Sequence, residues 1–132
     1  DVMVVAIDGN CASFGKKRNE ILDATKALYR DRLVTACPDP HIERWYMADP
    51  ESFYQVVGAM PRVGKHKCKR DYYKNALVQA IQDAGQPINL EGIVFAPELA
   101  AAMNLYRAGQ DQHSLKALID ELRGKIRQIG QS

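Results

Sequence analysis

The first ten residues constrain the fold more strongly than any other part of the chain. Residues 2–7 form an unbroken run of six apolar residues, mostly β-branched, and Asp8-Gly9-Asn10 follows directly. A short apolar run without alternation is typical of a strand that is buried on both faces, as in parallel α/β sheets. The run therefore predicts a central parallel strand, fully buried, over residues 2–7.

Asp8 would lie at the carboxyl end of this strand. Open α/β sheets bind their ligands at the carboxyl ends of strands, so Asp8 is a candidate site residue. Gly9 would let the backbone and a ligand approach closely, because it has no side chain. Asp and Asn are also common turn formers after a strand, since their side chains bond their own backbone. The local sequence leaves a ligand site and a structural turn as alternatives.

Length and composition indicate a single domain. The chain has 132 residues, of which 46% are apolar, and its net charge of +2 is only mildly basic. Cys11, Cys37 and Cys68 are widely spaced and odd in number, so we expect reduced cytosolic thiols, with neither a disulfide framework nor a zinc site. The sequence shows no signal peptide and no apolar run of membrane-spanning length, which favours a cytoplasmic protein without membrane contact. It starts without Met at a core strand, which suggests a piece of a longer protein.

Apolar stripes at helical spacing account for most of the remaining chain. They predict helices over residues 16–33, 70–84 and 99–105 and over the C-terminal residues after a cap at Asp111 or Ser114. Gly109 is expected to break the helical pattern between the last two. A second short strand is predicted over residues 34–37, and a short strand or extended segment over residues 93–96.

Two Asp-Pro pairs predict further helix starts. Asp39-Pro40 and Asp49-Pro50 each combine a good N-cap with the residue favoured at the first helical position. Glu43 falls off the apolar side of the first of these helices. It could face the end of the sheet or only solvent.

A basic loop is predicted over residues 58–69. No acidic residue lies between Ser52 and Arg70, and the cations of this part of the chain are Arg62, Lys65, Lys67, Lys69 and Arg70, with His66 among them. Such a density of cations suits phosphate contacts, because neutralised phosphates release their condensed counterions. An ordinary solvated surface would show the same composition.

Several common catalytic motifs are absent from the sequence. It contains no Walker-type phosphate loop, no G-x-G-x-x-G fingerprint and no nucleophile elbow around its serines. The histidines His41, His66 and His113 lack the spacing of metal ligands.

Four segments together resemble small bacterial TOPRIM-like (topoisomerase–primase fold) proteins, many of which are linked to anti-phage defence. The segments are residues 7–11 (IDGNC) with 17–21 (KRNEI), residues 38–45 (PDPHIERW) with 47–49 (MAD), residues 67–74 (KCKRDYYK), and residues 95–100 (FAPELA) with 103–105 (MNL). Their order and spacing, more than any single segment, carry the resemblance.

The resemblance implies an α/β fold, with a parallel sheet flanked by helices (Rossmann-like) and a helical C-terminal half, and a Mg²⁺ site in which Mn²⁺ could substitute. In the family, a Glu after the first strand and an Asp-x-Asp after a later strand hold the metal. Asp8 and Asn10 match the Asp-x-Asp, with Asn10 in place of the second Asp. In the family, the strand that carries the first Glu should precede Asp8, and this sequence has no such strand. We therefore expect that this N-terminal strand is missing or that a partner supplies the strand. Glu43 is a possible second carboxylate.

The function implied by the resemblance is a Mg²⁺-dependent nuclease that acts in anti-phage defence. The expected partners are nucleic acid and a protein such as an ATPase in a defence complex. The expected site residues are Asp8 and Glu43 for catalysis, Asp8 and Asn10 for the metal, and Lys65, Lys67, Lys69 and Arg70 for phosphates. The alternative is a catalytically silent interaction module of the same fold, which binds a partner protein or nucleic acid. A small-molecule enzyme on an α/β scaffold is a third possibility, because fold does not fix function.

Overall fold

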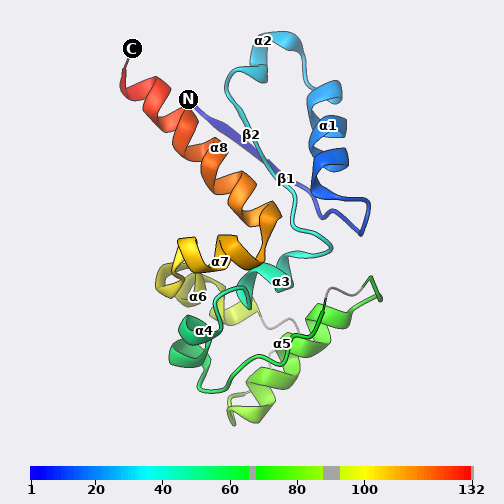
Figure 1. Cartoon of the computed structure of the whole chain (residues 1–132), viewed down its shortest axis with the longest axis vertical. Coiled ribbons are helices and arrows are strands. Elements are labelled where there is room, and N and C mark those ends of the chain that lie inside the picture. Colours follow the sequence, from blue (N-terminus) through cyan, green and yellow to red (C-terminus); the bar gives the residue numbers. More distant parts are fainter. Residues whose placement is uncertain (66–67, 88–92, 132) are drawn as a thin grey trace.

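The chain folds into a small parallel sheet with helices around it, in a computed structural model that describes residues 1–65, 68–87 and 93–131 (Figure 1). The strands are β1 (Met3–Ala6) and β2 (Leu33–Ala36). The helices are α1 (Phe14–Ala24), α2 (Ala27–Arg30), α3 (Ile42–Tyr46), α4 (Pro50–Val57), α5 (Tyr72–Asp83), α6 (Ala96–Ala102), α7 (Leu105–Asp111) and α8 (His113–Gly130), with a 3₁₀ turn at Ile93–Phe95. The predicted α/β class is correct at this level.

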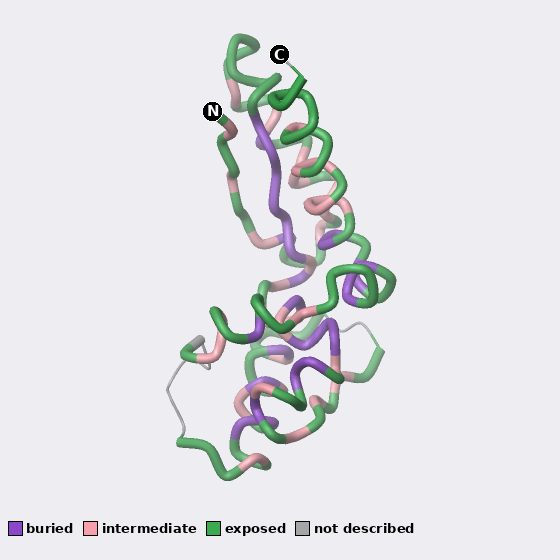
Figure 2. Tube along the Cα trace, turned by 90° about the vertical axis from the view of Figure 1, so that its left-hand side faces the viewer, coloured by how far each residue is buried: buried purple, intermediate pink, exposed green. Residues whose placement is uncertain are grey.

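The two strands run parallel, with Met3 opposite Leu33 and Ala6 opposite Ala36. All four residues of β2 are buried, whereas Met3 and Val4 of β1 are 44% and 52% exposed. The prediction of a fully buried central strand over residues 2–7 is therefore wrong, and the buried strand is β2. Among the described residues no third strand pairs with β1, so β1 remains at the edge while β2 lies between β1 and the helices (Figure 2).

The two sides of β2 pack into different clusters. Leu33 and Cys37 pack with Ile21 of α1, and Ala36 packs with Leu115 of α8. Figure 1 shows α8 running along the sheet toward the C-terminus, as its long apolar stripe requires. The side chain of Glu121 on α8 reaches Arg18 Nε at 3.5 Å and Thr35 Oγ1 at 3.4 Å. This carboxylate therefore links α8 to both α1 and β2.

The helix predicted over residues 16–33 is divided in the structure. α1 ends at Ala24, a separate turn of helix forms α2, and β2 already begins at Leu33. Thr25 follows α1 in an extended conformation, and its hydroxyl donates to the Ile21 carbonyl at 2.7 Å. A threonine that bonds locally in this way competes with helix continuation.

The second half of the core lies between α4, α5 and α6. Its buried residues include Phe53, Tyr73, Leu77 and Leu99. The helix predicted over residues 70–84 is confirmed as α5, and Gly85 follows it with a φ of +69°, the left-handed conformation that ends many helices.

The Asp-Pro start signals have different outcomes. Asp49 precedes α4 with Pro50 at the first helical position, as predicted. At the other pair, α3 begins only at Ile42, and His41 is its N-cap.

The C-terminal helices also differ from the prediction. Gly109 lies inside α7 and is buried, where an added Cβ would come within 3.3 Å of Lys116 Cβ on α8. This glycine therefore allows α7 and α8 to pack closely and does not break the helix. The N-cap of α8 is Gln112. Ser114 instead accepts a hydrogen bond of 2.9 Å from the buried Trp45 indole.

No described helix combines the length and the apolar character needed to cross a membrane.

Candidate functional site

The candidate site lies where β1 and β2 end. The backbones stay paired beyond the strands, with hydrogen bonds from Ile7 N to Ala36 O at 3.0 Å and from Gly9 N to Pro38 O at 2.6 Å. Asn10 N continues the series to Pro40 O at 3.0 Å. Parallel strands end at the same edge of a sheet, so the loop after β1 meets the segment that leads into α3.

Gly9 is required by this close approach. A Cβ built on Gly9 would lie 3.1 Å from both Pro38 O and Asp39 Cβ, which is tighter than ordinary van der Waals contact. The sequence predicted that Gly9 permits a close approach of a ligand. In the structure the neighbour that approaches is the chain itself.

Asp8 is half-buried and faces the start of α3. The backbone N–H of Ile42, the first residue of α3, favours the charged form of the Asp8 carboxylate. Burial raises the pKa of Asp8 above its usual value, the negative charge of Glu43 raises it further, and His41 opposes the shift. These effects require Asp8, His41 and Glu43 to lie within electrostatic range of one another. The structure thus brings together Asp8 and Glu43, the two carboxylates that the sequence selected.

Asn10 and Asp39 contribute differently. Asn10 is exposed and has a φ of +47°, a left-handed conformation that asparagine tolerates better than most residues. Asp39 Oδ1 accepts a hydrogen bond of 3.1 Å from Cys11 N, so this carboxylate holds the loop after β1. Within residues 1–65, 68–87 and 93–131, no three or more His, Cys, Asp or Glu side chains gather as a metal site would require.

A disulfide joins the site to the basic loop. Cys11 and Cys68 are bonded, with their Cα atoms 5.8 Å apart, so the expectation of reduced thiols is wrong for this pair. The two residues are 57 positions apart, and only the folded chain brings them together. Cys37 remains a free, buried thiol, and burial raises its pKa.

The disulfide places the predicted phosphate-binding residues close to the site. Lys69 and Arg70 directly follow Cys68 and are exposed. Arg70 has a weak ion pair with its neighbour Asp71, in which Nε and Oδ2 are 3.7 Å apart. Lys65 is exposed as well, while Lys67 lies outside the described residues.

Two cavities adjoin this region. One, of about 260 Å³, is lined by Lys65 and by Arg44 of α3, and thus connects the basic loop to the helix that carries Glu43. A second, of about 360 Å³, is lined by Asp39 and again by Arg44. Arg44 is tied down on the protein side, since its Nη1 donates to Asp39 O at 3.0 Å and its guanidinium lies 5.5 Å from the centre of the Tyr73 ring.

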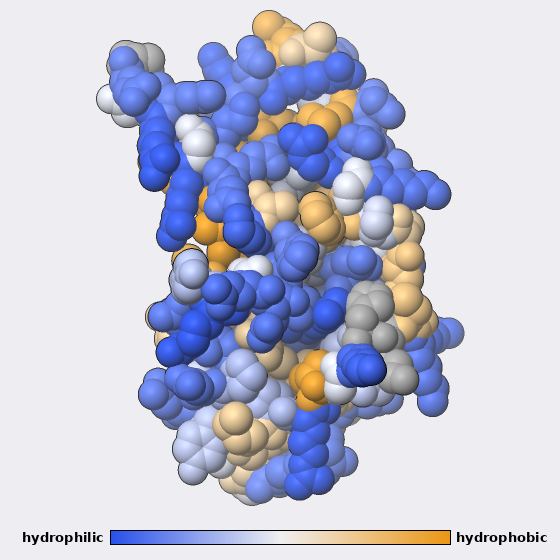
Figure 3. Space-filling view, viewed as in Figure 1, coloured by the Kyte–Doolittle hydropathy of each residue, from blue (hydrophilic) through white to orange (hydrophobic). Residues whose placement is uncertain are grey.

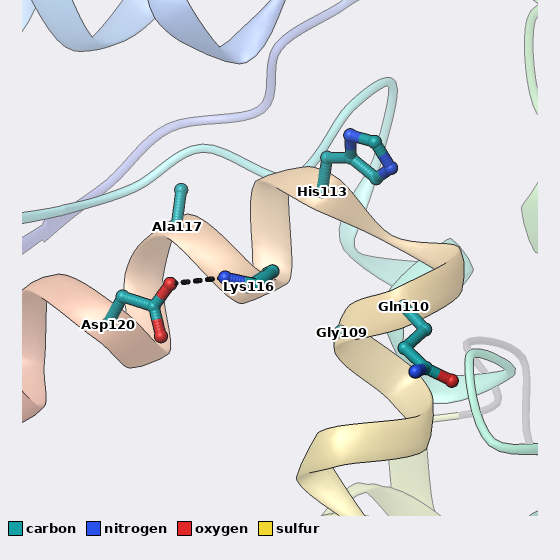
Figure 4. A pocket seen from close by; sticks show the side chains of 6 residues that line it. All are labelled: Gly109, Gln110, His113, Lys116, Ala117 and Asp120. Atoms are coloured by element: carbon teal, nitrogen blue, oxygen red, sulfur yellow. Dashed lines mark hydrogen bonds and ion pairs between the residues drawn. The ribbon is translucent and has the colours of Figure 1, made fainter.

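A third hollow, of about 600 Å³, lies at the bend between α7 and α8 (Figure 4). Its charged side chains, Lys116 and Asp120, point toward one another and form an ion pair of 2.7 Å. None of the residues predicted for the site lines this hollow. Its two charged groups already pair with each other, so it offers less to a charged ligand than the end of the sheet does.

His41, Asp39 and Arg44 are the site residues that the sequence reasoning did not select. They belong to the segment Pro38-Asp39-Pro40-His41, or follow it closely, immediately after the second predicted strand. Since the carboxyl ends of parallel strands lie at the same edge of a sheet, the residues after the second strand are candidates for the site as much as those after the first.

The chain matches no protein-family model, and no curated protein or solved structure shows significant similarity to it. The resemblance to TOPRIM-like proteins therefore stays a prediction from the sequence motifs.

Proposed function

We propose that the protein is a Mg²⁺-dependent nuclease whose site lies at the carboxyl end of the sheet. The observation that carries the proposal is the position of Asp8 directly after β1, within electrostatic range of Glu43 and next to a basic loop that the Cys11–Cys68 disulfide holds in place. Phosphodiester cleavage needs both features, because the substrate is an anion and the reaction develops further negative charge.

The residues present suit a hard divalent cation, although they form an incomplete set. Asp8 and Glu43 supply carboxylate oxygens, and Asn10 supplies an amide oxygen, which are ligand types that Mg²⁺ prefers. Burial is the main cause of the raised pKa of Asp8, the negative charge of Glu43 adds to it, and a bound cation would relieve this repulsion. Bound there, Mg²⁺ would lower the pKa of a water molecule and stabilise the leaving oxygen.

The other residues have binding and positioning roles in this proposal. Lys65, Lys69 and Arg70 attract the phosphate backbone without reading its sequence, since charge contacts to phosphates carry no base information. Gly9 keeps the loop after β1 close to Pro38, which sets the position of Asp8 relative to α3.

Cleavage assays test the proposal directly. Single- and double-stranded DNA and RNA are incubated with the protein in Mg²⁺, Mn²⁺ or EDTA, and the variants Asp8→Asn and Glu43→Gln are compared with the wild type. Each variant should abolish metal-dependent cleavage. The matched control is Asp23→Asn, which removes an exposed carboxylate on α1 and should leave cleavage unchanged. Equal cleavage by the wild type and Asp8→Asn would refute the role of Asp8.

A catalytically silent binding module is the second candidate, and one observation favours it. In the part of the chain that the structure describes, no three His, Cys, Asp or Glu side chains gather at the site as a metal centre would require. The module would bind nucleic acid or a protein such as an ATPase in a defence complex, the setting that the sequence resemblance suggests. Salt-dependent nucleic-acid binding without cleavage under any metal would support this candidate over the nuclease.

A further inference from the structure

The outer edge of β1 has unused hydrogen-bonding groups. Met3 N and Ile7 N donate to Arg32 O and Ala36 O, so these alternate residues of β1 face β2. In a parallel pair the intervening residues direct both their N–H and their C=O groups to the opposite side. The backbone groups of Val2, Val4 and Ala6 therefore point away from β2, and no other strand in the described part of the chain pairs with them.

The same edge is apolar and unguarded. Residues 2–7 contain no charge and no proline, and Met3, Val4 and Ile7 are 44%, 52% and 44% exposed. Edge strands in natural proteins usually carry a lysine, a proline or a bulge that prevents pairing with another chain. Hydrophobic surface shows between hydrophilic residues in the half of the molecule that holds the sheet (Figure 3).

We propose that this edge pairs with the β1 edge of a second copy of the chain, antiparallel and with the twofold axis at Val4. In this register Val2 exchanges backbone hydrogen bonds with Ala6 of the other copy, and Val4 exchanges them with its own counterpart. Only apolar residues then face one another between positions 2 and 6. The edge is thus complementary to itself in both hydrogen bonding and polarity.

The dimer would also extend the small sheet of the isolated chain. A two-stranded sheet is marginal by itself, and pairing through β1 gives one continuous sheet with four strands.

Light scattering after size exclusion, together with sedimentation velocity, measures the mass of the 132-residue chain from micromolar to hundred-micromolar concentrations. The wild type should give twice 14.8 kDa. Val4→Lys should weaken the dimer at least about tenfold, because the two lysines would face each other across the axis. Val4→Glu should do the same, and a one-to-one mixture of both variants should restore the dimer. The control Tyr106→Lys replaces an apolar side chain that is 77% exposed on α7 and should leave the dimer intact.

Circular dichroism melts establish that each variant is folded. A wild type that remains at 14.8 kDa throughout the concentration range overturns the proposal, and so does an open-ended assembly of rising mass. A dimer that persists in Val4→Lys would show that another surface forms it. Failure of the mixture to recover the dimer would overturn the twofold axis at Val4 even if both single variants dissociate.

Discussion

Asp49 links the start of α4 to the turn between α6 and α7, and its replacement tests how much this link stabilises the fold. Its side chain is 2% exposed and accepts hydrogen bonds from Ser52 Oγ, from Asn104 N at 2.8 Å, and from Arg107 Nε and Nη2 at 3.1 and 3.2 Å. Ser52 Oγ also lies 2.8 Å from Ala102 O, so its single O–H is directed between the two acceptors. This network fixes the start of α4 against the turn between α6 and α7.

Asp49→Asn keeps the shape of the side chain and removes its charge. Hydrogen bonds to a charged group contribute about 1.5–3 kcal/mol, and breaking a fully buried ion pair costs about 3–5 kcal/mol. Arg107 is 46% exposed and can regain water, so the cost lies toward the lower range. We expect the free energy of unfolding to fall by about 2–3 kcal/mol, which lowers the melting temperature by about 8–12 °C.

The control is Glu51→Gln. Glu51 pairs with the same Arg107, at 3.0 Å from Nη1 to Oε2, but is 70% exposed. A surface pair of this kind contributes less than about 1 kcal/mol. Urea titrations followed by circular dichroism at 222 nm measure the change in unfolding free energy for both variants. The urea midpoint should shift, whereas the slope of the unfolding free energy against urea concentration should stay the same.

The dependence on pH follows from the pKa of Asp49. Burial alone would raise that pKa, but the hydrogen bonds from Ser52, Arg107 and Asn104 outweigh burial and lower it. A carboxyl with a lowered pKa in the folded state stabilises the protein above its unfolded pKa, near 3.9, and loses this contribution as the pH falls through the folded pKa. The difference in the free energy of unfolding between the wild type and Asp49→Asn should therefore be constant near neutral pH and decrease below about pH 4. A difference in unfolding free energy below about 0.5 kcal/mol, or one equal to the difference that Glu51→Gln causes, would refute this account.

Three further predictions concern other parts of the molecule. Ser114→Ala leaves the buried Trp45 N–H without its acceptor and should cost about 1–3 kcal/mol in urea titrations; a cost near zero would contradict the importance of this bond. Asp8→Asn should slightly raise the melting temperature near neutral pH without metal, because burial raises the pKa of Asp8 and disfavours its charged form. Millimolar Mg²⁺ should raise the melting temperature of the wild type alone, and an equal rise in the variant would argue against a metal at Asp8. Replacing Lys65, Lys67, Lys69 and Arg70 with alanine should flatten the salt dependence of nucleic-acid binding by up to about one unit of log–log slope for each lost phosphate contact, whereas an unchanged slope would show that they form ordinary surface.

Features that depend on neighbouring residues could be predicted from the sequence. The start of α4 at Pro50 and the extent of α5 follow from caps and helical periodicity, which are local signals. β2 was also predicted within one residue. Asp8 follows β1 as the sequence predicted, whereas the roles of Asp8 and Glu43 in a site stay predictions.

Features that depend on distant parts of the chain could not be predicted in this way. An apolar run indicates that a strand can be buried on both faces. It does not determine whether other strands or helices cover the strand, and in the described part of the chain β1 pairs with β2 alone. Gly109 reads as a helix breaker by propensity, but tertiary contact with Lys116 decides its role. The pairing of Cys11 with Cys68 depends on the folded chain and has no local signal.

The disulfide also determines what a protease can release. Cys11 and Cys68 close a covalent ring that contains Lys65 but excludes Lys69 and Arg70. A trypsin-type cut after the exposed Lys65 therefore opens the ring, and the two resulting polypeptides stay linked until a reductant is added. A cut after Lys69 lies outside the ring, so both cysteines remain on the N-terminal product and the C-terminal product is held only by non-covalent packing. Two nicks four residues apart thus yield molecules with opposite behaviour on non-reducing gels.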